Sequence, residues 1–184
     1  MTVIGTISHE YGHLLAAKLM GFNARINYMS TWLTNNRQLM TDKQDFWLKL
    51  AGPLQTILTG TIGFLFLSTS FKNTERLTKG QWALVFISLF WLRQSANFVI
   101  WLTAYLITGN YSAQGDEINL SRYLNWPDWS IISFTAFIGF MLLTIVIFKF
   151  IPKSQRFTFI LSGLIGGISG YLLWLVYFGK FIMP

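Results

Sequence analysis

Five long apolar stretches separated by polar connections dominate the hydrophobic pattern of this chain. The stretches cover roughly residues 1–21, 47–71, 82–107, 130–151 and 157–178. A helix needs about 20 mostly apolar residues to cross a bilayer, and the pattern therefore predicts about five transmembrane helices. We expect an all-α, polytopic membrane protein folded as a single membrane-embedded domain over residues 1–184.

The polar connection after the first stretch, residues 22–46, predicts a small β-hairpin. Polar and apolar residues alternate from Arg25 to Tyr28, as they do in a strand. Asn35 and Asn36 suit a tight turn, and a second extended run could follow from Arg37. Such a hairpin, around residues 25–41, could hold an extended substrate peptide as a further strand, or it could lie at the membrane surface without touching a substrate.

The connection between the third and fourth stretches, residues 108–129, is long and rich in acidic residues. It contains Asp116, Glu117 and Asp128, three of the seven acids in the chain. Long connections of this kind are often functional. A short helix over residues 117–125 is also expected here, with Asp116 as its N-cap.

Composition supports a membrane protein and limits the chemistry that the chain can perform. Hydrophobic residues make up 53% of the sequence and charged residues only 11%, against about one quarter in soluble proteins. The chain has no cysteine, which excludes disulfides and thiolate metal sites. Its net charge of +7 is scattered between apolar blocks, which favours anionic lipid headgroups over nucleic acid as a partner.

Both histidines of the chain lie in the first apolar stretch, in the run His9-Glu10-Tyr11-Gly12-His13. Residues four apart share one face of a helix, so the two imidazoles can reach one ion while Glu10 lies beside it. This is the HExxH pattern of zinc hydrolases. Ionisable groups at membrane depth are costly and usually functional, which disfavours the alternative of two buried structural histidines.

A catalytic zinc takes three protein ligands and keeps one position for water, so a third ligand is required. Cysteine is absent and both histidines are already used, which leaves a carboxylate. Apart from Glu10, the carboxylates are Asp42, Asp45, Glu75, Asp116, Glu117 and Asp128. Asp116 and Glu117 are the best candidates because they follow Gly115, which allows a sharp turn in a loop that could dip to the metal.

Several other polar residues could stabilise an oxyanion or bind a substrate. The candidates are Asn97, Arg93, Gln55 and Asn110. Arg93 and Asn97 are four apart and would share a helix face near the depth expected for the metal. A buried polar pair that only fixes helix packing is the alternative for these two residues.

The last apolar stretch contains four glycines, which would allow another helix to approach closely. They are Gly163, Gly166, Gly167 and Gly170. Plain helix packing explains such spacing better than chemistry does. A second copy of the chain is one candidate partner.

The run from Ser8 to Lys18, SHEYGHLLAAK, resembles the zinc-binding transmembrane helix of the site-2 protease family of intramembrane metalloproteases. Two further features are similar to that family: the stretch Ala51-Gly52-Pro53-Leu54 at the start of the next span, and an Asp about one hundred residues after the motif, matched here by Asp116. Gln55 stands where the family often has an Asn, and Asp116 follows Gly115 instead of preceding a glycine. The chain has no insert large enough for a PDZ domain, so the resemblance is to a minimal form.

The resemblance implies a zinc protease that cuts transmembrane segments of other proteins within the cell membrane. In such an enzyme His9, His13 and Asp116 hold Zn²⁺, and Glu10 is the general base that accepts a proton from the attacking water. Glu10 then protonates the leaving amine. The expected partners are a transmembrane substrate and the bilayer.

Three other functions remain open from the sequence. The first is a different membrane HExxH protease whose third ligand is a glutamate, here Glu117 or Glu75. The second is a relative that binds metal or transmembrane clients without cutting them, although an intact Glu10 argues against it. The third is a transporter or channel, which the odd number of spans, the absence of a repeat between the halves and the placement of both histidines in one HExxH motif disfavour.

Overall fold

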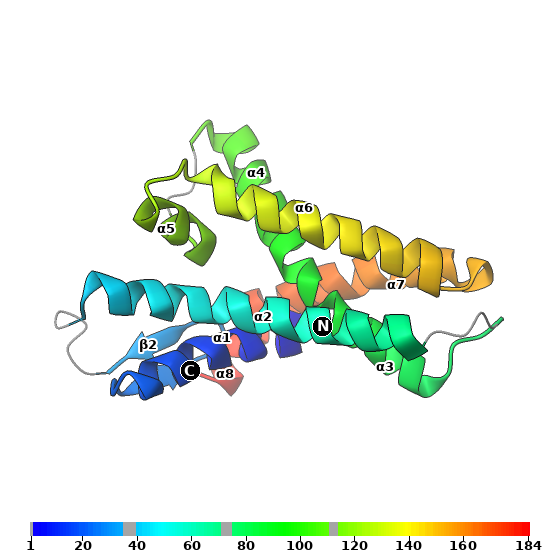
Figure 1. The fold of residues 1–184 in the computed structure, drawn as a ribbon, viewed down its shortest axis with the longest axis horizontal. Coiled ribbons are helices and arrows are strands. Elements are labelled where there is room, and N and C mark those ends of the chain that lie inside the picture. The colour runs from blue at the N-terminus through cyan, green and yellow to red at the C-terminus, as the bar shows by residue number, and fades with distance from the viewer. Residues whose placement is uncertain (1, 35–39, 71–74, 111–113) are drawn as a thin grey trace.

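The computed structural model describes residues 2–34, 40–70, 75–110 and 114–184, and it is helical apart from one small hairpin (Figure 1). The helices are α1 (Thr2–Leu19), α2 (Asp42–Ser70), α3 (Lys79–Ser88), α4 (Leu92–Thr108), α5 (Asp116–Tyr123), α6 (Trp129–Ile145), α7 (Lys153–Tyr171) and α8 (Gly179–Ile182), and the strands are β1 (Ala24–Ile26) and β2 (Thr31–Leu33). A short 3₁₀ segment, Leu89–Trp91, joins α3 to α4, and π-helical segments extend α6 over Val146–Phe150 and α7 over Leu172–Phe178. The all-α class with a small hairpin is thus confirmed.

Four continuous helical units in the described chain are long and apolar enough to cross a membrane. They are Asp42–Ser70, Lys79–Thr108, Trp129–Phe150 and Lys153–Ile182. Each coincides with one of the expected apolar stretches, which supports a membrane protein. The first stretch also forms a helix, α1, but it is shorter than these four, and the buried polar residues His9, Glu10 and His13 interrupt its apolar character.

The hairpin lies where the sequence predicts it, directly after α1, but its turn lies earlier in the chain than the expected turn at Asn35 and Asn36. Ala24 pairs with Leu33 and Ile26 with Thr31, so the turn spans Asn27 to Ser30. The side-chain Oδ1 of Asn27 accepts hydrogen bonds from the backbone N–H groups of Met29 and Ser30, at 2.9 and 2.8 Å. The side chain of Asn27 therefore closes the turn about eight residues before the turn expected at Asn35 and Asn36. Asn35, Asn36 and Arg37 themselves lie outside the described residues.

Helices α1 and α2 pack closely along the first half of the molecule (Figure 1). A Cβ atom on Gly12 would lie only 2.5 Å from the backbone oxygen of Ala51, so the two backbones meet where Gly12 has no side chain. On the same surface the amide of Gln55 donates to the hydroxyl of Ser8 at 3.0 Å. This packing fixes the histidine-bearing face of α1 against the start of α2.

Helix α5 is held above the first half of α2 by a small hydrophobic cluster (Figure 1). Ile118 of α5 packs with Trp101 of α4 and Ile132 of α6, and all three are buried. Ser121 adds a hydrogen bond that its hydroxyl accepts from the backbone N–H of Ile131, at 3.2 Å. Because contacts with α4 and α6 hold α5 in place, its first residue, Asp116, has a defined position beside α1.

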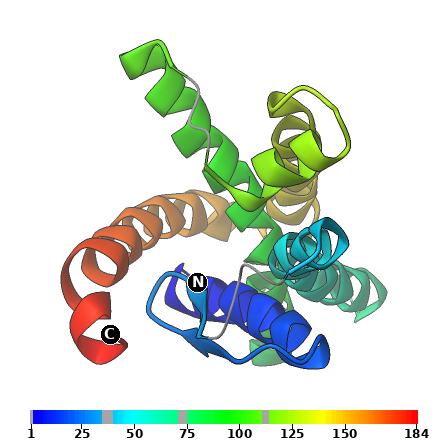
Figure 2. The same ribbon diagram turned by 90° about the vertical axis from the view of Figure 1, so that its left-hand side faces the viewer.

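The C-terminal helical unit curves away from the other helices and returns to the hairpin (Figure 2). None of the residues of α7, all of which are described, is buried. The far end is attached, since the indole Nε1–H of Trp174 donates to the backbone oxygen of Tyr28 at 2.8 Å. The backbone N–H of Tyr28 in turn donates to Met183 at 3.0 Å. The unit is therefore secured at the hairpin, and α7 is open around Gly163 and Gly166, between its contacts with α3 at Phe159 and with α1 at Gly170.

Candidate metal centre

Two imidazoles and one carboxylate meet at a single point between α1 and α5. The Nε2 atoms of His9 and His13 are 3.2 Å apart, and each lies 3.1 Å from Oδ2 of Asp116. The two histidines come from successive turns of α1, and Asp116 comes from the first turn of α5, more than one hundred residues later. The three atoms form an almost equilateral triangle.

The ring of His13 is oriented by a backbone carbonyl of α2. Its Nδ1 lies 2.6 Å from the oxygen of Leu48, and because a carbonyl can only accept, Nδ1 must carry the proton. With Nδ1 engaged in this way, Nε2 is the ring nitrogen that faces His9 and Asp116. Metal-ligating histidines usually donate their other ring N–H to a carbonyl or carboxylate oxygen in this way. The Nδ1 of His9 is buried without a hydrogen-bond partner among the described residues.

A glycine of α2 leaves the space that the two rings occupy. A Cβ atom on Gly52 would lie 2.3 Å from Nε2 of His13 and 2.6 Å from Nε2 of His9. No side chain could be accommodated there without moving the rings. Gly52 belongs to the Ala51–Leu54 stretch, so this stretch packs directly against the two histidine rings.

Glu10 lies beside this triangle on the same helix. A carboxylate oxygen of Glu10, a ring nitrogen of His9 and a ring nitrogen of His13 lie within 4.8 Å of one another. Glu10 is 5% exposed, and its Oε2 accepts a hydrogen bond of 2.9 Å from the hydroxyl of Thr31 in β2. The hairpin thus contacts the acid directly, a link that nothing in the sequence pattern indicated.

The two neighbouring acids of α5 have different surroundings. Burial favours the neutral form of Asp116, but hydrogen bonds with His13 and His9 outweigh it and hold the pKa of this carboxyl below its usual range. Burial raises the pKa of Glu117, and the charge of Asp116 raises it further. Glu117 is 3% exposed and accepts a 3.4 Å hydrogen bond from the amide of Asn97, so it faces away from the histidines.

Asp116 does not act as the N-cap that the sequence also allowed. The N-cap of α5 is Gly115, with φ of 139°, a backbone conformation that only glycine adopts readily. Asp116 is the first residue within the helix, and its carboxylate reaches the histidines. The glycine therefore makes the sharp change of direction that brings the loop to α1.

The other acids named as ligand candidates lie elsewhere. Asp42 and Asp45 are in the first turn of α2, Glu75 is exposed, and Asp128 pairs with Arg122 at the protein surface. In the described part of the chain, only Asp116 has a carboxylate oxygen in hydrogen-bond contact with both histidines.

The polar residues expected near the site lie in three different surroundings. Arg93 and Asn97 lie close to α5, and together with Asp116 and Glu117 they line a cavity of about 330 Å³. The amide of Gln55 bonds to Ser8 and Thr59 within the α1–α2 contact. Asn110 is exposed, and its side chain bonds to the backbone of Thr108. The structure therefore brings the first pair to the site and leaves Asn110 away from it.

The triangle fits a tetrahedral zinc ion. Zinc–nitrogen and zinc–oxygen bonds of about 2.0–2.2 Å require ligand atoms about 3.3 Å apart at the corners of a tetrahedron. The observed separations of 3.1, 3.1 and 3.2 Å are close to that value. The donor set, two imidazoles and a carboxylate, also has the chemistry of a catalytic zinc site.

Comparisons of the chain with protein families, with curated proteins and with solved structures find no match. The geometry of the site therefore carries the functional argument.

Proposed function

We propose that this protein is an intramembrane zinc metalloprotease of the multi-pass type, located in the cell membrane, which hydrolyses peptide bonds in or near transmembrane segments of other proteins. The observation that carries the proposal is the convergence of His9, His13 and Asp116 within 3.2 Å, with Glu10 beside them. The four apolar helical units support a membrane location for this chemistry.

Within this proposal His9, His13 and Asp116 hold the zinc. A bound zinc ion would supply Lewis acidity and lower the pKa of water to about 7. The chain supplies the rest. The hydrogen bond that Nδ1 of His13 donates to the backbone oxygen of Leu48 orients this ring, and the carboxylate of Asp116 offsets positive charge at the centre.

Glu10 is the residue that transfers protons. Thr31 holds its Oε2, which leaves Oε1 to accept a proton from water and later to donate it to the amine of the leaving peptide. Burial of Glu10 keeps bulk water away from this exchange. Asn97 lies along the adjoining cavity and is the candidate donor to the substrate carbonyl, and Arg93 beside it is a candidate substrate-binding residue.

The hairpin is suited to hold the substrate in an extended form. Hydrolysis requires an accessible peptide carbonyl, and an added strand presents one. Thr31 belongs to β2 and touches Glu10, so a peptide that pairs with this hairpin would run beside the proton-transfer group.

Substitution of Glu10 tests the proposal directly. Glu10→Gln should retain the fold and the zinc, because Gln is isosteric and residue 10 is not a ligand, while cleavage of a transmembrane peptide in detergent should fall by about 10²-fold or more. Asp128→Asn, which changes an acid remote from the centre, is the matched control and should cleave at the parental rate. Parental cleavage by Glu10→Gln would remove Glu10 from the mechanism, and zinc binding without any cleavage by the parent would favour a non-proteolytic metal-binding protein.

A further inference from the structure

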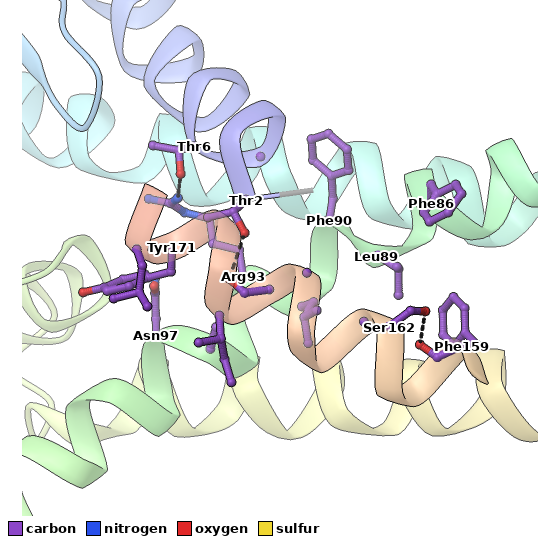
Figure 3. A pocket seen from close by; sticks show the side chains of 18 of the residues that line it. Thr2, Thr6, Phe86, Leu89, Phe90, Arg93, Asn97, Phe159, Ser162 and Tyr171 are labelled. Atoms are coloured by element: carbon purple, nitrogen blue, oxygen red, sulfur yellow. Dashed lines mark hydrogen bonds between the residues drawn. The ribbon is translucent and has the colours of Figure 1, made fainter. Parts of the chain in front are cut away.

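A large groove opens between α1, α4 and α7, next to the candidate metal centre. Its volume is about 970 Å³, and most of the residues that line it are apolar or small. Figure 3 shows Thr2 and Thr6 of α1 on one side, Arg93 and Asn97 of α4 beneath them, and Tyr171 at the end of α7. Among the described residues that line the groove, Arg93 is the only charged one.

The guanidinium of Arg93 has few partners for a group in this position. Its Nη1 donates to the hydroxyl of Thr6 over 3.4 Å, a long hydrogen bond, and its Nε is buried without a partner among the described residues (Figure 3). No described Asp or Glu lies within ion-pair distance of it, although the charges of Glu10, Glu117 and Asp116 act on it from further away. A guanidinium carries five N–H donors, so most of its hydrogen-bonding capacity remains for a ligand.

Arg93 also connects the groove to the candidate metal centre. Arg93 and Asn97 line both the groove and the smaller cavity that contains Asp116. A ligand that extends from the groove toward Asp116 must therefore pass this arginine. Charged groups at membrane depth are costly and are usually paired directly, so a carboxylate of the ligand at hydrogen-bond distance would give Arg93 the direct partner that the more distant acids do not provide.

The walls of the groove suit a helix better than a lipid chain. A Cβ atom added at Gly5, Gly163, Gly166 or Gly167 would meet nothing within 4 Å, so both the α1 wall and the α7 wall leave open space. Small residues spaced four apart, such as Gly163 and Gly167, allow a helix backbone to approach closely, whereas an acyl chain gains nothing from them.

We propose that this groove holds the transmembrane helix of the substrate and that Arg93 selects segments with an Asp or Glu side chain inside the apolar stretch. The carboxylate would accept paired hydrogen bonds from the guanidinium, the geometry for which arginine is best suited. Arg93 is thereby a specificity-determining residue, and the acid of the substrate sets which peptide bond reaches Glu10. This inference rests on the proposed proteolytic function.

The test compares paired synthetic transmembrane peptides that differ only in Glu or Gln at one position, with that position moved stepwise through the apolar stretch. For the parent protein we expect one position at which the Glu peptide is cleaved with a kcat/KM about tenfold higher than the Gln peptide. In Arg93→Gln this ratio should fall to about one, and Arg93→Lys should restore part of the preference. Arg122→Gln removes an exposed arginine outside the groove and should leave the ratio unchanged.

A second measurement separates this proposal from the proposed function. Binding of the fluorescently labelled Glu and Gln peptides to Glu10→Gln, with and without Arg93→Gln, requires no cleavage. A preference for the Glu peptide that disappears with Arg93→Gln supports the site even if no peptide is cut. Cleavage without a Glu preference at any position overturns the role of Arg93 and leaves the protease intact. Equal binding of both peptides, together with Arg93-dependent binding of a labelled fatty acid, would assign the groove to lipid and also overturn the proposal.

Discussion

The α1–α2 contact and the middle of α7 differ sharply in how closely they pack. Around His9 and His13 the backbones approach so closely that a single added methyl group, at Gly12 or Gly52, would collide with its neighbours. Along α7 an added methyl group at Gly163 or Gly167 would meet open space. Close packing fixes the direction of the polar side chains in the first region, and its absence in the second leaves room for a ligand.

The contrast suggests a division of labour within one chain. The candidate chemistry depends on atoms placed within a few tenths of an ångström, which only a densely packed contact can maintain. Recognition of a helical substrate needs a surface that is free in the absence of that substrate. Substitutions in the first region should therefore impair metal binding and turnover, while those in the C-terminal unit should mainly affect stability or selectivity.

The largest effect is expected from Gly52→Ala. The new methyl group would lie 2.3 Å from Nε2 of His13, so the rings must move and the ligand triangle opens. We expect zinc affinity to fall by about 100-fold or more, as measured by competition with a zinc chelator. Gly80→Ala in α3 is the matched control, because a Cβ there meets nothing within 4 Å and affinity should not change. Parental zinc affinity in Gly52→Ala would show that the centre is not packed as described.

A smaller effect is expected from loss of the hydroxyl that holds Glu10. Thr31→Val keeps the shape of the side chain but removes the 2.9 Å hydrogen bond to Oε2. We expect kcat to fall about tenfold, which corresponds to one hydrogen bond of about 1.4 kcal/mol, with zinc content unchanged. Thr31→Ser retains the hydroxyl and should recover most of the activity. If the Val and Ser variants were equally impaired, packing and not the hydrogen bond would explain the loss.

The smallest effect on the centre is expected from the far end of the C-terminal unit. Trp174→Phe removes the hydrogen bond to the backbone of Tyr28, which should lower the free energy of unfolding by about 1 kcal/mol in a detergent denaturation experiment. Zinc affinity should stay at the parental value. Trp126→Phe changes an indole that is 55% exposed and provides the control for loss of ring size. A drop in zinc affinity in Trp174→Phe alone would mean that the two regions are coupled.

Much of the fold could be predicted because hydrophobic length is a strong signal. Four expected stretches coincide with helical units, and the hairpin follows α1 as expected. The position of its turn was missed because a local side-chain contact, Asn27 with the backbone of Ser30, decides it, and Asn-Asn offered an equally plausible turn further along. The sequence pattern does not rank such local alternatives.

The candidate site was only partly predictable, for a similar reason. The spacing of His9 and His13 fixes one helix face, but adjacent Asp116 and Glu117 look alike in a sequence. The start of α5 at Asp116 separates them, since successive helical residues point about 100° apart and only the first reaches the histidines. Contacts from Leu48 and Thr31 depend on distant packing and leave no signal in the motif.

The central claim is that His9, His13 and Asp116 form a zinc site, and metal content tests it most directly. The purified parent protein should contain about one zinc per chain by elemental analysis, held by three protein ligands. Titration at one fixed pH, because protons compete with the metal for the ligands, should show a loss of about 100-fold or more in Asp116→Asn. Glu117→Gln should bind zinc like the parent, since its carboxylate faces Asn97. A folded parent that takes up no zinc, or an Asp116→Asn variant that binds it as tightly as the parent does, would contradict the account.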